Sequence, residues 1–172
     1  MNQHLTILAS VIEECNKHIK IITTAFPGLK KIIPLNDKTF EKLNDDEVRL
    51  VDQFIYRFSM LQDAMGKRLF PALLHSLEED VKSMPFIDIL NKIEAMGLMT
   101  SKEEWLYLTK LRNEFSHEYS NAAVENAETI NTLFEKANLV YHTFIKIKNY
   151  SLNKFEDFKG NISRFETAQF PD

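Results

Sequence analysis

Hydrophobic residues recur at spacings of three and four along most of the chain, which is the pattern of helices that bury one face. The first stripe lies near the beginning of the chain, at Leu5, Leu8, Ile12, Cys15, Ile19 and Ile22. We expect Phe26-Pro27-Gly28 to end this helix, because proline and glycine disfavour a helix interior. Residues 29–44 predict a connector with a short turn of helix near Thr39–Leu43.

A second apolar stripe covers residues 48–69, and Asn44 or Asp45 stands where a cap for its helix is needed. Pro71 predicts a bend or an end, after which the pattern resumes as far as Leu77. This part of the chain therefore predicts either one kinked long helix or two abutting helices.

A shorter helix is expected between Pro85 and Gly97. Thr100 and Ser101 each precede a glutamate by three residues, which is the spacing of a capping box. A helix should therefore begin there and continue to Arg112.

The last stripe predicts a long helix from about residue 123 to residues 155–158, with Ser120 and Asn121 as its caps. The tail, residues 161–172, has no sustained period and is expected to be poorly ordered or to act as a docking arm. The predicted fold is all-α: an up-and-down helical bundle of four to five helices, with residues 1–160 as a single domain. The 13 phenylalanines are expected to form its core.

A length of 172 residues is enough to bury a core without disulfides or structural metal. The few glycines and prolines, 4 and 5, argue against a turn-rich β architecture. Cys15, the single cysteine, lies in an apolar stripe; we expect it to be structural, although His18 three residues later leaves a nucleophilic pair to consider.

No apolar run reaches the roughly 20 residues that span a bilayer, and the first residues lack the basic start of a signal peptide. We therefore expect a soluble, cytoplasmic protein that does not contact membranes. The formal net charge of −4 argues against broad nonspecific binding of nucleic acid, so any contact with RNA has to be local.

The residues with the most reactive side chains are concentrated in positions 111–120, which contain Arg112, His117 and Tyr119. The guanidinium fork fits phosphate, and the imidazole exchanges a proton near neutral pH. On an unbroken helix Arg112 and Tyr119 share nearly one face, whereas His117 points well away from Arg112. We therefore expect a phosphate-ester site at a helix end, or one completed by a second copy of the chain.

Two other interpretations of this segment need no phosphate chemistry. Glu114 and His117 have the Glu-x-x-His spacing of di-iron bundles, but that fold needs a second such pair, which the sequence lacks. We therefore expect no metal site. Alternatively, Arg112 forms a salt bridge with an acidic residue such as Glu118, His117 caps a helix end and Tyr119 closes the core.

The order Arg112-Asn113, His117, Tyr119 resembles the motif of the HEPN superfamily, and within it the HepT-like toxins that pair with minimal nucleotidyltransferases. The resemblance extends over about residues 45–150, and the motif precedes the last long helix. Residues 1–44 and the tail carry little of it.

The resemblance implies a helical homodimer in which two copies of the motif line one cleft, with metal-independent endoribonuclease activity and no cofactor. Arg112 and His117 would be the catalytic residues and Asn113 a supporting one. The cognate nucleotidyltransferase would act as antitoxin in a type VII-like toxin–antitoxin pair by transferring AMP to Tyr119. RNA would be the substrate.

Two alternatives to a ribonuclease remain open at this point. One is a noncatalytic subunit that binds nucleotide or substrate for a nucleotidyltransferase, and the other is a purely structural helical dimer. The presence of His117 favours the ribonuclease, since a binding subunit has no evident need for a group that transfers protons.

Overall fold

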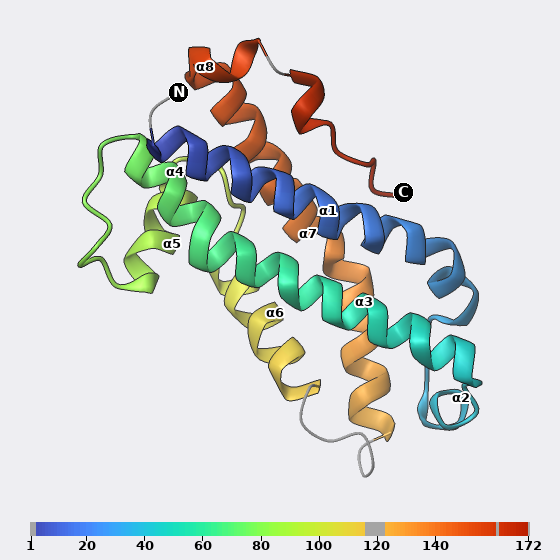
Figure 1. Ribbon diagram of the computed structural model, residues 1–172. Helices are drawn as coiled ribbons and strands as arrows, with labels where there is room; N and C mark the ends of the chain where they lie inside the picture. The colour runs from blue at the N-terminus through green and yellow to red at the C-terminus, as the bar shows by residue number, and fades with distance from the viewer. Residues whose placement is uncertain (1–2, 116–122, 161, 172) are drawn as a thin grey trace.

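The computed structural model describes residues 3–115, 123–160 and 162–171, and these residues form an all-α bundle with no strand among them (Figure 1). The main helices run up and down, as the sequence predicts. None of the described helices combines the length and apolar character that crossing a bilayer requires.

Helix α1 (Gln3–Ile32) lies beside α3 (Asp45–Ala64) in Figure 1. The expectation that Phe26-Pro27-Gly28 ends the first helix is wrong, because α1 continues through Pro27. Phe26 and Leu29 are buried on the same face, and this packing outweighs the cost of the proline. A Cβ on Gly28 would lie 2.6 Å from Leu50 Cδ2, so glycine permits the close approach of α1 and α3.

The connector after α1 contains the short helix α2 (Asp37–Glu41), near the predicted turn of helix. The Asn36 side chain caps α2 and forms a capping box with Thr39. The connector is tied to the last long helix by Asn131, whose Oδ1 accepts from the Leu35 N–H and whose Nδ2 donates to the Leu35 carbonyl, each at 2.8 Å.

Helix α3 continues through a π-helical segment, η1 (Met65–Leu69), into α4 (Phe70–Ser76), so of the two alternatives the single long helix is correct. Asn44 is its cap: the Asn44 side chain accepts from two backbone N–H groups, and Glu47 completes the capping box. Pro71 has no N–H and crowds the carbonyl four residues earlier. The wider π turn before Pro71 accommodates it without a break.

Helix α5 (Phe86–Ala95) is followed by Gly97 at φ 71°, a left-handed conformation that favours glycine. Helix α6 (Lys102–Phe115) then begins after Ser101, whose hydroxyl accepts from the Glu104 N–H at 3.1 Å. Both boundaries confirm the prediction from the sequence.

Helix α7 (Ala123–Lys154) is the long last helix, and a short α8 (Glu156–Lys159) follows it. Its predicted caps, Ser120 and Asn121, lie outside the described residues. The tail packs on the body, so of the two expectations the docking arm is confirmed. Phe165, at the end of the 3-10 helix η2 (Ile162–Phe165), is buried, and the Phe170 ring lies 4.6 Å from the Phe26 ring.

Phenylalanine rings fill much of the core, as expected. The rings of Phe26 and Phe134 stack at 4.5 Å, which joins α1 to α7, and Phe54 of α3 packs beside both. Phe86 is the exception: it is 43% exposed, and no other phenylalanine side chain is exposed.

Candidate functional site

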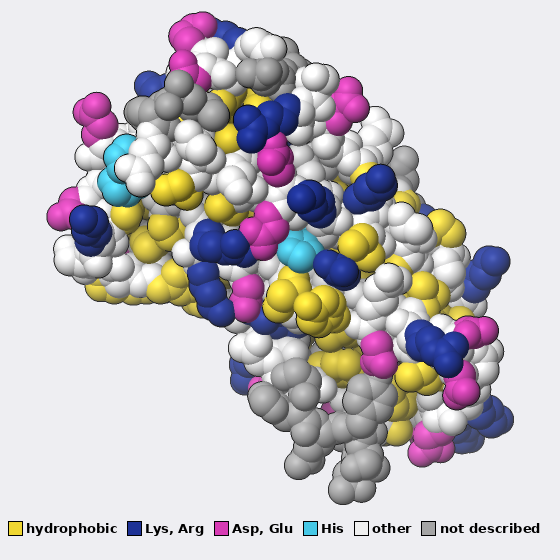
Figure 2. Space-filling view, viewed as in Figure 1, with side chains coloured by type: hydrophobic (Ala, Val, Ile, Leu, Met, Phe, Trp, Pro, Cys, Tyr) yellow, Lys and Arg dark blue, Asp and Glu magenta, His cyan; other side chains and the backbone are white. Residues whose placement is uncertain are grey.

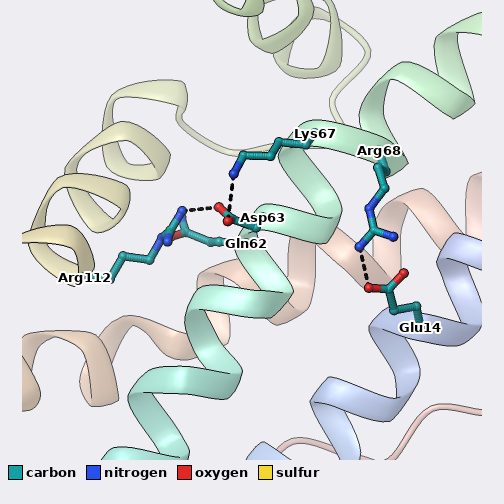
Figure 3. A network of polar contacts seen from close by, with 6 residues as sticks. All are labelled: Glu14, Gln62, Asp63, Lys67, Arg68 and Arg112. Carbon is teal, nitrogen blue, oxygen red and sulfur yellow. Dashed lines mark hydrogen bonds and ion pairs between the residues drawn. The ribbon is translucent and has the colours of Figure 1, made fainter. Parts of the chain in front are cut away.

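Arg112 lies in the last turn of α6 and reaches across to α3 (Figure 3). Its Nε donates to Gln62 Oε1 at 2.9 Å, and its Nη2 donates to Asp63 Oδ1 at 2.5 Å. The side chain is only 10% exposed. The prediction that Arg112 lies near the C-terminal end of its helix is confirmed. Among the described residues, the acidic partner of Arg112 is Asp63.

Gln62 fixes the position of this guanidinium. It is buried, and its Nε2 donates to the Trp105 carbonyl of α6 at 3.2 Å. Trp105 and Arg112 are two turns apart and therefore share one face of α6. A buried amide that bonds the same helix twice cannot rotate without losing a partner, so the Arg112 side chain is held in one orientation.

The Asp63 carboxylate pairs with two basic side chains at once. Lys67 Nζ lies 2.8 Å from Asp63 Oδ2, on the opposite carboxylate oxygen from Arg112 (Figure 3). Burial alone would raise the pKa of Asp63, but the hydrogen bonds and charges of Lys67 and Arg112 outweigh it and lower that pKa. Two cations share one carboxylate, so the cluster keeps a net positive charge.

Two hollows adjoin the Arg112 side chain. The first, here called the Tyr56 hollow, measures about 290 Å³ and is lined by Asp52, Tyr56, Ser59, Arg112, Asn113 and neighbouring apolar side chains. The second, the Phe86 hollow, measures about 410 Å³ and is lined by Asp63, Lys67, Phe86, Trp105, Arg112, Asn113 and others. Both volumes are near the lower end for small-ligand sites, about 300–1,000 Å³.

The structure places some of the predicted site residues and leaves others undescribed. Arg112 and Asn113 are adjacent on α6, and both line both hollows. His117 and Tyr119, like Glu118, lie outside the described residues, so their distances from Arg112 stay predictions.

Sequence reasoning missed the residues that hold Arg112. Gln62 and Asp63 lie 50 and 49 positions before it, a separation that no helical period connects. Two local signals were present: Gln62 interrupts an apolar stripe, and Asp63 precedes Lys67 by one helical turn.

A second polar cluster lies on the other side of this helical run, between α1 and α3 (Figure 3). Arg68 of η1 pairs with Glu14, which in turn lies 3.7 Å from His18 Nε2, and Arg57 of α3 lies 3.4 Å from His18 Nδ1. Figure 2 shows basic side chains among carboxylates and a histidine on this face. Burial lowers the pKa of His18, and the charge of Arg57 lowers it further.

Cys15 is fully buried, and burial raises the pKa of its thiol, which keeps it protonated. The described contacts of His18 are with Glu14 and Arg57 rather than with Cys15. These observations confirm the burial expected for Cys15 and give no support to a nucleophilic pair.

Metal-ligating side chains do not converge in the part of the chain that the structure describes. No group of three or more histidine, cysteine, aspartate or glutamate side chains gathers there. Glu114, the first residue of the Glu-x-x-His spacing, lies 3.7 Å from Lys110 on the same helix.

The fold and site define an all-α bundle with two hollows at the junction of α3 and α6 that share the Arg112–Asp63–Lys67 cluster. Comparison with protein-family models, curated proteins and solved structures found no match for this chain. A function therefore has to be argued from the arrangement around Arg112.

Proposed function

We propose that this chain is a HEPN-type, metal-independent endoribonuclease, the toxin of a pair whose antitoxin is a cognate minimal nucleotidyltransferase. The observation that carries the proposal is the restrained guanidinium of Arg112, held by Gln62 and Asp63 between two hollows. The chain reaches His117 and Tyr119 five and seven positions later.

The environment of Arg112 suits a phosphate-binding group. Its bonds to Gln62 and Asp63 use two of the five N–H groups of a guanidinium, and no other described residue accepts from it. The N–H groups from which no described residue accepts can donate to phosphate oxygens. Lys67, on the same carboxylate, adds a second positive charge. Preorganised donors of this kind stabilise negative charge that grows in a transition state.

The proposed reaction needs no metal because the RNA supplies the nucleophile. The 2′-hydroxyl attacks the adjacent phosphorus while the bond from phosphorus to the 5′-oxygen breaks. One proton leaves the 2′-hydroxyl and one is added to the 5′-oxygen, with His117 as base or acid, and in a dimer each copy supplies one imidazole. The products are a 2′,3′-cyclic phosphate end and a 5′-hydroxyl end.

Cleavage of labelled RNA by purified protein in chelator tests this proposal. Wild type should produce fragments with cyclic phosphate ends, and His117→Ala should not. His142→Ala is the matched control, because His142 is an exposed histidine on α7, and it should cleave like wild type. If wild type leaves the RNA intact, or if His117→Ala cleaves equally well, the ribonuclease proposal is wrong.

Control by the nucleotidyltransferase is the second part of the proposal. AMP on the Tyr119 hydroxyl would add a negative charge and a bulky group seven positions after Arg112, and would compete with the RNA phosphate there. Mass spectrometry after incubation with the partner enzyme and ATP should show added AMP on wild type and none on Tyr119→Phe. Modification of the Tyr119→Phe protein would show that another residue is the acceptor.

A nucleotide-binding subunit without catalysis is the alternative that the geometry also suits. The Phe86 hollow combines the cations Lys67 and Arg112 with the apolar rings of Phe86 and Trp105, which matches the phosphate and base of a nucleotide. Binding of RNA or nucleotide with no cleavage in any condition would favour this alternative.

A further inference from the structure

Each of the two hollows beside Arg112 contains an exposed aromatic ring. Tyr56 is 57% exposed in the Tyr56 hollow, and Phe86 is 43% exposed in the Phe86 hollow. Exposing an aromatic ring to water costs the stabilising free energy that its burial would contribute. Proteins that bind single-stranded nucleic acid use rings in such positions to stack unpaired bases.

The charges beside the rings fit a nucleic acid rather than an apolar partner. Lys67 of the Phe86 hollow and Arg112 are the basic side chains, among the described residues, that line the two hollows. Of these two, Arg112 is the one that lines both hollows. The phosphate therefore belongs at Arg112, with a base and its ribose in each hollow.

The spacing of the rings favours unpaired bases. Gly66 marks the position of Phe86 along the α3–η1 run, because a Cβ on Gly66 would lie 3.3 Å from Phe86 Cζ. Tyr56 and Gly66 are separated by about 15 Å of helix axis, at about 1.5 Å per residue. Neighbouring bases of a duplex strand are stacked about 3.4 Å apart, so a paired strand cannot place its bases in both hollows.

We infer that the substrate class of this site is single-stranded RNA, with a base stacked on Tyr56 on one side of the Arg112-bound phosphate and a base stacked on Phe86 on the other. That the bound strand is RNA rests on the proposed function. The inference assigns Tyr56 and Phe86 as base-binding residues, and it explains why both remain exposed beside a buried core.

Binding is measured separately from cleavage. A fluorescein-labelled single-stranded RNA of mixed sequence is titrated, in chelator and at low salt, with the His117→Ala protein, which is the parent of the variants below. Adding Tyr56→Ala or Phe86→Ala should raise Kd by roughly five- to hundred-fold, the usual loss for one stacked base. The matched control is Tyr107→Ala, because Tyr107 is 46% exposed on α6 and lies outside both hollows; it should bind like the parent protein.

Ring-retaining variants separate stacking from packing. Tyr56→Phe and Phe86→Tyr should recover most of the affinity that the alanine variants lose, whereas Phe86→Leu, which keeps bulk without an aromatic face, should not. If the Phe86→Ala protein lacks the circular dichroism of a folded helical protein, Phe86→Leu takes its place in the binding test. The same RNA annealed to its complement should bind more weakly than the single strand.

The outcomes distinguish this inference from the proposed function. Alanine variants that bind like Tyr107→Ala, or duplex that binds as tightly as single strand, would overturn the inference even if wild type cleaves RNA. Ring-dependent binding without cleavage by wild type would overturn the ribonuclease and leave the base sites standing. If the parent protein binds no RNA and wild type cleaves none, both are wrong.

Discussion

The guanidinium of Arg112 on α6 donates a hydrogen bond to the carboxylate of Asp63 on α3, with 2.5 Å between Nη2 and Oδ1. The Arg112 side chain is 10% exposed and the Asp63 side chain 28%. A partly buried ion pair is screened less than a surface pair, and removing one partner leaves the other without its counter-charge. The bond therefore stabilises the contact between α3 and α6 and sets the direction of the guanidinium.

Asp63→Ala should lower the free energy of unfolding by roughly 1–3 kcal/mol, because it leaves a nearly buried guanidinium with Gln62 as its one described partner. Urea denaturation followed by circular dichroism measures this change. Asp46→Ala is the matched control: Asp46 also pairs with an arginine on α3, but its side chain is 90% exposed. We expect the control to cost no more than about 1 kcal/mol. Equal losses in the two variants would contradict the structural role of Asp63.

Stability should depend on pH through His18. Burial, and then the charge of Arg57, lowers the pKa of His18, while Glu14 opposes the shift and Arg68 adds to it. The unfolded chain therefore binds the proton more tightly than the folded chain. The stabilisation is complete above the ordinary histidine pKa of about 6.5 and is lost as the pH falls below it.

Urea denaturation at several values between about pH 7.5 and about pH 5.5 tests the His18 effect. The free energy of unfolding of wild type should decrease toward the acidic end, and His18→Gln should flatten this dependence. His142→Gln, which changes an exposed histidine on α7, should keep the wild-type slope. A wild-type slope in the His18→Gln protein would contradict the assignment.

The cap of α3 gives a prediction that is independent of the site. Asn44 accepts from the N–H groups of Asp46 and Glu47, each at 3.0 Å. Asn44→Ala should therefore lower the free energy of unfolding by about 1 kcal/mol, and Asn44→Asp should restore most of it, since aspartate caps equally well. Thermal and urea denaturation measure the stability of both variants. An Asn44→Ala protein as stable as the Asn44→Asp protein would exclude the side-chain cap.

Local rules were enough to predict most helix boundaries from the sequence. Asn44, Ser101 and Gly97 act through bonds or dihedral angles that involve only a few neighbouring residues. Pro27 shows where such rules fail. Its effect on the helix is decided by the packing of Phe26 and Leu29 against distant helices, which the local pattern does not contain.

The site was predictable only in part, for the same reason. The capping box at Ser101 predicts where the helix of Arg112 begins, and the caps expected for the next helix, Ser120 and Asn121, place Arg112 near its end. Its partners Gln62 and Asp63 depend on how α3 crosses α6, which a single sequence does not specify. The exposure of Phe86 was likewise unpredictable, since composition assigns a phenylalanine to the core.

Dependence of RNA cleavage on Arg112 is the most direct test of the proposed function. The measurement is kcat/KM for one single-stranded RNA in chelator, with wild type, Arg112→Ala, Arg112→Lys and Arg49→Ala, each checked for helical circular dichroism. Arg49 is the matched control because its side chain is 75% exposed on α3. We expect Arg112→Ala to lower kcat/KM by about 10²–10³-fold, Arg112→Lys to restore only part because lysine lacks the planar fork, and Arg49→Ala to match wild type. Equal kcat/KM for wild type and a folded Arg112→Ala protein would contradict the role of Arg112.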